Sequence, residues 1–140
     1  MQDTFHHFPL FERMLALRQS GPPGEMQMHR VRHKKWLLII FSPSAAHPDY
    51  VAFKRELGRR GMDLVEHDIL VMEALEDGRS RVGDTDLDMP SVMSVRRHFG
   101  ARDGEFSIVL ADREGRVLFE ARHAEPLDEI LGLIHHVPLR

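Results

Sequence analysis

The chain has 140 residues, of which 42% are hydrophobic, and a net charge of −3 at pH 7. This length and apolar content suit one domain with a single core, and the slightly negative charge excludes a general attraction to nucleic acid. The sequence contains no cysteine, which excludes disulfides, thiolate metal sites and thiol redox chemistry. No apolar run in the sequence has the length that a membrane-spanning helix needs.

The first predicted element is a short apolar helix over residues 9–19, with a proline in its first turn. Its apolar residues are Leu10, Phe11, Met14, Leu15 and Leu17. A Gly-Pro-Pro-Gly break follows at 21–24, so we expect residues 1–25 to form an N-terminal helical extension and residues 26–140 to form the domain. Because the helix is apolar over a wide face, we expect it to pack against a second copy of the chain, which favours a homodimer.

The apolar run Trp-Leu-Leu-Ile-Ile-Phe at 36–41 predicts a strand that is buried on both faces of a parallel sheet. A short loop follows this strand. Pro48 suits the first turn of a helix, which we expect over residues 48–60 and which a glycine ends. A second strand is expected over residues 64–71.

The next stretch, from Glu73 to Met89, is acidic and contains two glycines, so we expect a mobile loop. Pro90 then opens a helix with apolar residues three and four positions apart, and Gly100 ends it. Arg97 lies in the last turn of this helix, where a positive charge suits the negative end of the helix dipole.

A β-hairpin and a last helix complete the predicted domain. Strands at 106–110 and 117–121 flank an Asp-Arg-Glu-Gly turn, and apolar residues at helical spacing follow Pro126. Strand, helix, strand, helix, hairpin and helix is the element order of the thioredoxin fold, whose first crossover is right-handed. We therefore expect an α/β protein with a four-stranded mixed sheet of order 2-1-3-4. Its first two strands should be parallel, and helices should cover both faces.

Four motifs also indicate a family. They are Trp-Leu-Leu-Ile-Ile-Phe-Ser-Pro-Ser at 36–44, Glu-His-Asp-Ile at 66–69, Leu-Ala-Asp-Arg-Glu-Gly at 110–115 and Ile-His-His-Val-Pro-Leu-Arg at 134–140. On these motifs the chain resembles the domain-of-unknown-function family numbered 4174, also described as P-DUDES, over residues 34–140. The resemblance implies a thioredoxin-like fold, and the family has no established activity. His67 departs from the family's usual arginine, and only Ile134, Pro138 and Arg140 match its closing pattern outright.

The loop after the first strand is also similar to the peroxiredoxin pattern Pro-x-x-x-Thr-x-x-Cys. Pro43 aligns with the proline of this pattern, His47 with its threonine and Tyr50 with its reactive cysteine. A phenol with an ordinary pKa of about 10 cannot replace a thiolate as a reductant of peroxide. Ser107 stands at about the place of the cis-proline that is typical of thioredoxins. Both features predict a redox-inactive protein.

Ser44, His47 and Asp68 are candidates for a catalytic triad. Ser44 and His47 are close in sequence, and we expect Asp68 to arrive from the neighbouring parallel strand, at the edge of the sheet where ligands bind in open α/β folds. Alternatively, Ser44 or His47 caps the helix, while Asp68 accepts loop N–H groups or pairs with Arg97. No Gly-x-Ser-x-Gly nucleophile motif is present, which favours capping. Ser42, Ser44, His47 and Arg97 are then the candidate binding residues.

The ten histidines of the chain do not predict a metal site. His29 and His33 are four residues apart but lead into a strand, where such side chains lie about 13 Å from each other. Asp84, Asp86 and Asp88 resemble the start of a calcium-binding loop, but the glycine and the glutamate that complete such a loop are missing. We expect neither a metal nor a cofactor.

Together these observations favour a non-catalytic binding or interaction domain. Its partner is an unknown protein or small molecule, and neither nucleic acid nor a membrane is expected. The alternatives are a small hydrolase or transferase that uses Ser44, His47 and Asp68, and an assembly module that dimerises through helix 9–19. No export signal is evident, which predicts a cytoplasmic protein, or a periplasmic or secreted one if a signal has been removed.

Overall fold

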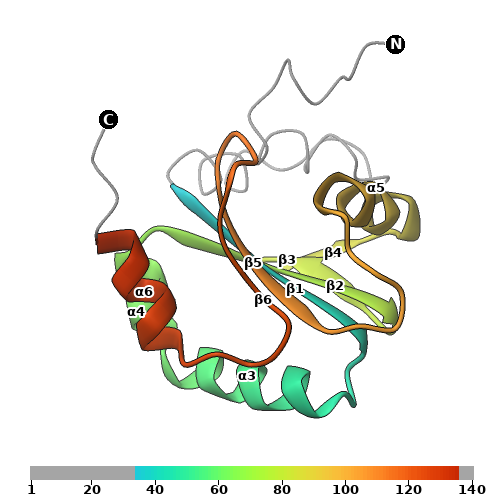
Figure 1. Cartoon of the computed structure of the whole chain (residues 1–140), viewed down its shortest axis with the longest axis horizontal. Coiled ribbons are helices and arrows are strands. Elements are labelled where there is room, and N and C mark those ends of the chain that lie inside the picture. Colours follow the sequence, from blue (N-terminus) through green and yellow to red (C-terminus); the bar gives the residue numbers. More distant parts are fainter. Residues whose placement is uncertain (1–33, 136–140) are drawn as a thin grey trace.

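The computed structural model describes residues 34–135, which form six strands and four helices (Figure 1). In chain order these are β1 (Trp36–Ser44), α3 (Pro48–Arg59), α4 (Gly61–Glu66), β2 (Ile69–Asp77), β3 (Ser80–Val82), β4 (Thr85–Leu87), α5 (Met89–Phe99), β5 (Ser107–Asp112), β6 (Val117–Ala121) and α6 (Leu127–His135). The helix predicted over 9–19 and the end of the closing motif, 136–140, lie outside the described residues.

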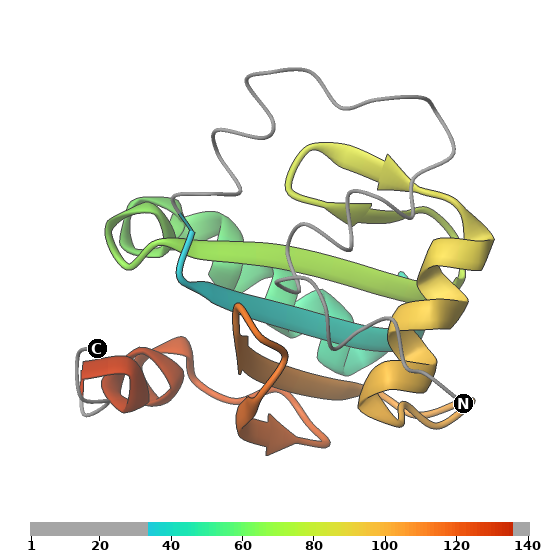
Figure 2. The ribbon, with the colours of Figure 1, turned by 90° about the horizontal axis from the view of Figure 1, so that it is seen from above.

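These six strands form one mixed sheet with the order β4-β3-β2-β1-β5-β6. Strand β1 lies inside the sheet, parallel to β2 and antiparallel to β5 (Figures 1 and 2). The predicted parallel pairing of the first two long strands is confirmed, and so is the position of the hairpin beside the first strand. The predicted number of four strands is wrong, because β3 and β4 extend the sheet beyond β2.

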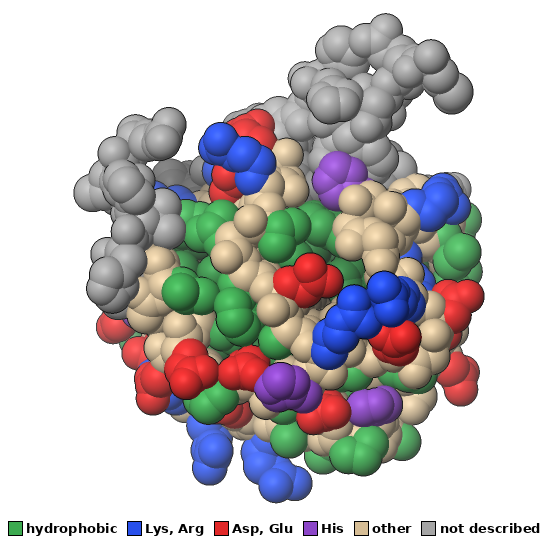
Figure 3. All heavy atoms as spheres, viewed as in Figure 1, with side chains coloured by type: hydrophobic (Ala, Val, Ile, Leu, Met, Phe, Trp, Pro, Cys, Tyr) green, Lys and Arg blue, Asp and Glu red, His purple; other side chains and the backbone are tan. Residues whose placement is uncertain are grey.

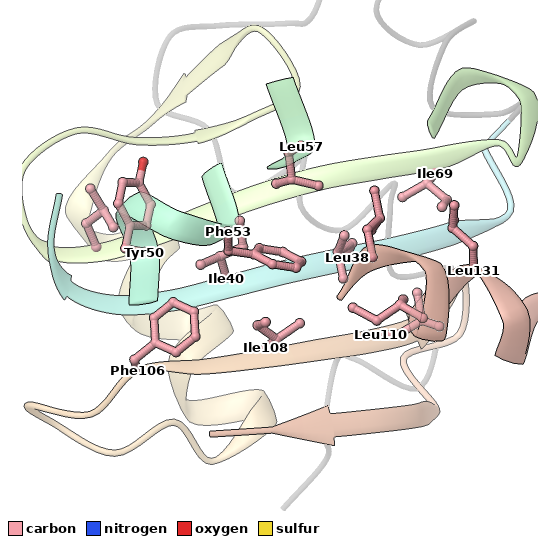
Figure 4. Close-up of a cluster of buried hydrophobic side chains, with 13 residues drawn as sticks. Leu38, Ile40, Tyr50, Phe53, Leu57, Ile69, Phe106, Ile108, Leu110 and Leu131 are labelled. Carbon is pink, nitrogen blue, oxygen red and sulfur yellow. The ribbon is translucent and has the colours of Figure 1, made fainter. Parts of the chain in front are cut away.

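Helices cover both faces of the sheet, as predicted (Figure 1). The core on the first face includes Tyr50, Phe53 and Leu57 from α3 and Leu127, Ile130 and Leu131 from α6 (Figure 4). On the opposite face, Val92 and Val95 of α5 pack against the sheet. Alternate side chains of β1 point to opposite faces of the sheet and pack into the two cores, and all five residues of 37–41 are at most 1% exposed. Because complete burial of such a side chain contributes about 1.5–3 kcal/mol, this apolar strand is central to the stability of the domain.

The second long strand covers Ile69–Asp77, so it begins five residues after the start of the predicted segment 64–71 and extends beyond its end. The residues before it form α4, from which Leu64 packs against the same core as α3. Asp68 then turns the chain with a φ of 56°, in the left-handed region. Its carbonyl oxygen accepts a hydrogen bond from the N–H of Trp36 at 3.1 Å, where the pairing of β1 with β2 begins. A short apolar run does not distinguish a helix from a buried strand, which explains the difference.

The acidic segment 73–89 forms strands rather than the predicted loop. Its first residues complete β2, and β3 and β4 form a hairpin beside that strand. The Oγ atom of Ser80 accepts a hydrogen bond from the N–H of Leu75 at 2.8 Å, which holds the connection between β2 and β3. Gly78 and Gly83 have φ values of 123° and 57°, which other residues rarely adopt. The two glycines therefore close tight turns.

The start of α3 and the end of α5 follow the predicted signals, whereas Gly61, the predicted stop of α3, is the first residue of α4. Helix α3 begins at Pro48 and ends one residue before the predicted boundary. Helix α5 has Asp88 as its N-cap, whose carboxylate accepts a hydrogen bond from the N–H of Ser91 at 2.9 Å. It ends at Gly100, which has a φ of 68°, in agreement with the predicted glycine stop.

Two carboxylates of α3 hold the segment that leads into α6, and we call this arrangement the α3 clamp. The Oδ1 atom of Asp49 accepts a hydrogen bond from the N–H of Ala124 at 3.1 Å. Two turns further along the same face, the Oε2 atom of Glu56 accepts one from the N–H of Leu127 at 2.9 Å. Leu127 is the first residue of α6, so the clamp satisfies a backbone donor that has no partner within its own helix.

Candidate functional site

The predicted loop residues make local hydrogen bonds at the carboxyl end of β1. Ser42 is buried and donates its hydroxyl to the carbonyl of Ser44 at 2.8 Å, while the Oγ atom of Ser44 accepts from the N–H of Ala46 at 3.2 Å. His47 is the N-cap of α3, because its Nδ1 atom accepts from the N–H of Asp49 at 3.2 Å. His47 is therefore the residue that caps the helix, whereas Ser44 makes its hydrogen bond within the loop.

The His47 ring also joins this loop to the segment before β5. It stacks on the ring of Phe106, with the ring centroids 5.5 Å apart and an angle of 15° between the planes. Phe106 is only 3% exposed, so the contact closes over the end of the core. Two loops that are far apart in the sequence therefore meet at the carboxyl end of β1.

Asp68 and Arg97 do not belong to this group. Asp68 precedes β2 and lies beside the start of β1, because the two strands are parallel and paired from Trp36 onward. Ser44 lies at the other end of β1, eight residues after Trp36, and at the rise of a strand these eight residues span about 26 Å. The structure therefore does not bring Asp68 to Ser44 and His47, and the idea that it supports their loop is wrong. Arg97 is exposed on α5, on the opposite face of the sheet from α3.

Three other side chains converge beside the loop. Tyr50 and Lys54 are four residues apart on α3 and share one face of that helix, and Glu73 lies in the middle of β2. The Tyr50 hydroxyl donates to Oε1 of Glu73, and the Lys54 ammonium donates to Oε2. Figure 4 shows the Tyr50 ring at one end of the apolar cluster, with its hydroxyl directed away from the cluster. Each oxygen of the carboxylate thus has its own donor.

Glu73 is a charge held in the core. It is 6% exposed, whereas the Lys54 side chain is 43% exposed and keeps contact with solvent. A buried carboxylate is costly unless donors compensate for its lost hydration, and these two side chains do so. Burial raises the pKa of the Tyr50 hydroxyl, and the hydrogen bond and negative charge of Glu73 raise it further, while the positive charge of Arg81 opposes the shift. Tyr50 therefore stays protonated and remains a donor.

An open cleft of about 440 Å³ lies at these residues, and we call it the α3–β3 cleft. It is lined by Ala45, Tyr50, Lys54, Glu73, Leu75, Arg79, Arg81, Asp84 and Asp86. Ala45 belongs to the loop after β1, so the cleft adjoins the predicted loop. Its volume is that of a small-molecule site.

The cleft is not predictable from any one stretch of the sequence, because its walls come from separate segments. The available signals were the four-residue spacing of Tyr50 and Lys54 and a single charge, Glu73, inside an otherwise apolar run at 69–75. An inward charge becomes visible only when the strand that carries it is placed correctly. The expected strand ended at residue 71, which left Glu73 in a solvated loop.

Two carboxylates of the α3–β3 cleft pair with basic side chains. Glu73 pairs with Lys54, and Asp86 pairs with Arg79 at 2.8 Å. Within residues 34–135, no group of three or more His, Asp or Glu side chains could hold a metal ion. The same part of the chain contains no helix with the length and apolar character needed to cross a membrane.

Comparison with known proteins gives one family. Residues 27–140 match the family described as Domain of unknown function (DUF4174), a match that includes every strand and helix described above. No curated protein matches the chain. Because the match covers far more than half of the sequence, the resemblance seen in the four motifs is confirmed, and the chain belongs to the DUF4174 family.

Proposed function

We propose that this protein is a thioredoxin-like binding domain without thiol redox activity. The order β1, α3, β2, α5, β5, β6, α6 supports this fold, as does the placement of α3 and α6 on one face and α5 on the other. On this interpretation, α4 and the β3–β4 hairpin are additions to the fold. The absence of cysteine from all 140 residues supports a role in binding rather than in thiol chemistry.

The ligand site that we propose is the α3–β3 cleft. The observation that carries this proposal is the buried carboxylate of Glu73 in the wall of an open cleft. Replacing a buried ion pair by apolar residues of similar size is often neutral or stabilising, so the core alone gives little reason for a charge at this position. A buried charge with specific partners in a cleft is typical of a functional site.

A hydrolase or transferase has less support. Ser44 and His47 each make local hydrogen bonds in the loop, and Asp68 lies near the opposite end of β1. The carboxylate of Asp49 lies beside His47, with its Oδ2 atom 4.0 Å from Nδ1, but this Nδ1 atom already accepts the N–H of Asp49. Among residues 34–135, no hydrogen bond joins the His47 ring to the Ser44 hydroxyl that it would have to activate.

An assembly module is the second candidate. Apolar side chains are visible on the face that carries β6 and α6 (Figure 3), and Val117 and Leu133 on these elements are 50% and 39% exposed. Light scattering of the full chain and of a chain without residues 1–25 tests this role. A dimer that becomes a monomer on truncation supports it, and two monomers at micromolar concentration contradict it.

A fragment screen tests the proposed binding site. We expect small fragments to shift backbone amide resonances around the cleft, in residues 45–54 and 73–86. Ala45 is exposed and lines the cleft, so Ala45→Trp should block these fragments by filling it. Ala52→Trp is the matched control, since Ala52 is exposed on α3 and outside the cleft lining. Fragments that gather elsewhere, or that bind Ala45→Trp as well as the wild type, contradict the proposal.

A further inference from the structure

One cation of the α3–β3 cleft lacks a counter-ion. Arg81 lies on β3 directly opposite Glu73, so that both side chains face the cleft. Its guanidinium makes no hydrogen bond and no ion pair with other residues of 34–135, and its Nε atom is buried without an acceptor. Glu73 itself already has one donor on each oxygen, from Tyr50 and Lys54.

The other two cations of the cleft are occupied. Lys54 pairs with Glu73, and Arg79 pairs with Asp86. The lining holds three cations and three carboxylates, so its formal charges balance, but Arg81 takes part in neither of these ion pairs and its guanidinium is the group that an anion can contact. A buried N–H donor without an acceptor is rare in folded proteins, because its lost hydration is not replaced.

We propose that the α3–β3 cleft binds a small organic monocarboxylate through the guanidinium of Arg81. This inference rests on the proposed function and names the ligand class of the same site. A guanidinium presents N–H donors in a flat fork that matches the two oxygens of a carboxylate. The carboxylates of Glu73, Asp84 and Asp86 line the same cleft, and their negative charges disfavour a dianion such as a phosphate monoester.

The remainder of the cleft suits the body of such a ligand. Ala45, the Tyr50 ring and Leu75 provide apolar lining on the same side as the loop after β1. The volume of about 440 Å³ accommodates a ring or a short chain attached to the carboxylate. The Tyr50 hydroxyl already donates its hydrogen bond to Glu73, so the ligand's carboxylate does not receive it.

Three probes that share a phenyl ring separate the contributions of charge and geometry. Benzoate carries the carboxylate, benzamide is its neutral counterpart, and phenyl phosphate carries a dianion. We expect benzoate to shift the amide resonances of residues 73–82 with saturation, and benzamide to bind at least tenfold more weakly. Benzamide that binds as tightly as benzoate overturns the inference. Phenyl phosphate that binds more tightly than benzoate also overturns it, because the site then prefers a dianion to a monocarboxylate. This comparison uses the wild-type protein and does not depend on a variant that folds.

Substitutions then test whether Arg81 is the contact. Arg81→Gln should weaken benzoate binding at least tenfold, or about 1.4 kcal/mol, and Arg81→Lys should give an intermediate loss because it keeps the charge without the fork. Arg116→Gln is the matched control, since its side chain is 72% exposed, pairs with Asp112 and lies outside the cleft lining, and we expect a change within about twofold. Benzoate affinity that is unchanged in Arg81→Gln refutes the assignment. Neutral fragments that enter the cleft while benzoate does not would leave the proposed function intact and refute only this inference.

Discussion

Replacing Tyr50 by phenylalanine tests the reasoning about the buried carboxylate most directly. The substitution keeps the aromatic ring in the core and removes only the hydroxyl that donates to Glu73. Hydrogen bonds to charged groups contribute about 1.5–3 kcal/mol to stability. Glu73 keeps Lys54 as its second donor, so we expect a loss near the lower end, about 1.5–2 kcal/mol.

Urea unfolding followed by fluorescence measures this loss. Trp36 is the only tryptophan and packs against the core on the α3 face, so its emission reports the unfolding of the described domain. In a thermal melt, the same loss corresponds to roughly 4 °C for each kcal/mol in a chain of this size. Val51→Ala is the matched control on α3, because Val51 is 40% exposed, and we expect a change within about 0.5 kcal/mol.

The same substitution in a protein that lacks the Glu73 carboxylate shows whether the loss comes from the Tyr50–Glu73 hydrogen bond. In a Glu73→Leu protein the Tyr50 hydroxyl has lost its acceptor, so removing that hydroxyl as well should cost almost nothing. The difference between the two backgrounds gives the coupling energy of the pair. If Tyr50→Phe lowers the free energy of unfolding equally with and without Glu73, or does not lower it in the wild type, the Tyr50 hydroxyl does not stabilise the Glu73 carboxylate.

Three further predictions follow from the same structure. Tyr50 is the only tyrosine, and its pKa is raised above the ordinary value of 10, so the stability that its protonated hydroxyl contributes should be fully present below about pH 10 and be lost as the pH rises further. Ultraviolet absorbance should then show tyrosinate only as the protein unfolds, and a native protein that ionises at pH 10 contradicts this. Asp68 has a φ of 56°, so Asp68→Gly should be more stable than Asp68→Ala by about 1 kcal/mol in urea unfolding, and the reverse order counts against left-handed strain. Since the chain has no thiol, the purified protein should neither reduce disulfides nor consume peroxide by turnover, and activity that survives removal of thiol contaminants disproves it.

The parts of the fold that were predictable are those whose signal is local. The apolar run at 36–41 needs no knowledge of its neighbours to indicate a doubly covered strand, and it forms the inside strand β1. Gly100 ends α5 because its own backbone adopts a left-handed conformation, which is also a local property.

The parts that were missed depend on partners distant in sequence. Glu73 belongs to the buried face of β2 only because Tyr50 and Lys54 arrive from α3 to hold its charge. Without those partners, a charge followed by acidic residues and glycines has the composition of a solvated loop. The stacking of His47 on Phe106 is equally invisible in sequence, because the two residues are close only after β1 and β5 have paired.

The α3 clamp also bears on how the domain opens. Asp49 and Glu56 fix the backbone just before and at the start of α6, although α3 and α6 stand at opposite ends of the described chain. Local unfolding of α3 would remove the acceptor for the first N–H of α6 together with the apolar surface on which that helix rests. The first and last helices of the described domain thus form one cooperative unit across the sequence, so a break in either exposes the same face of the sheet to solvent.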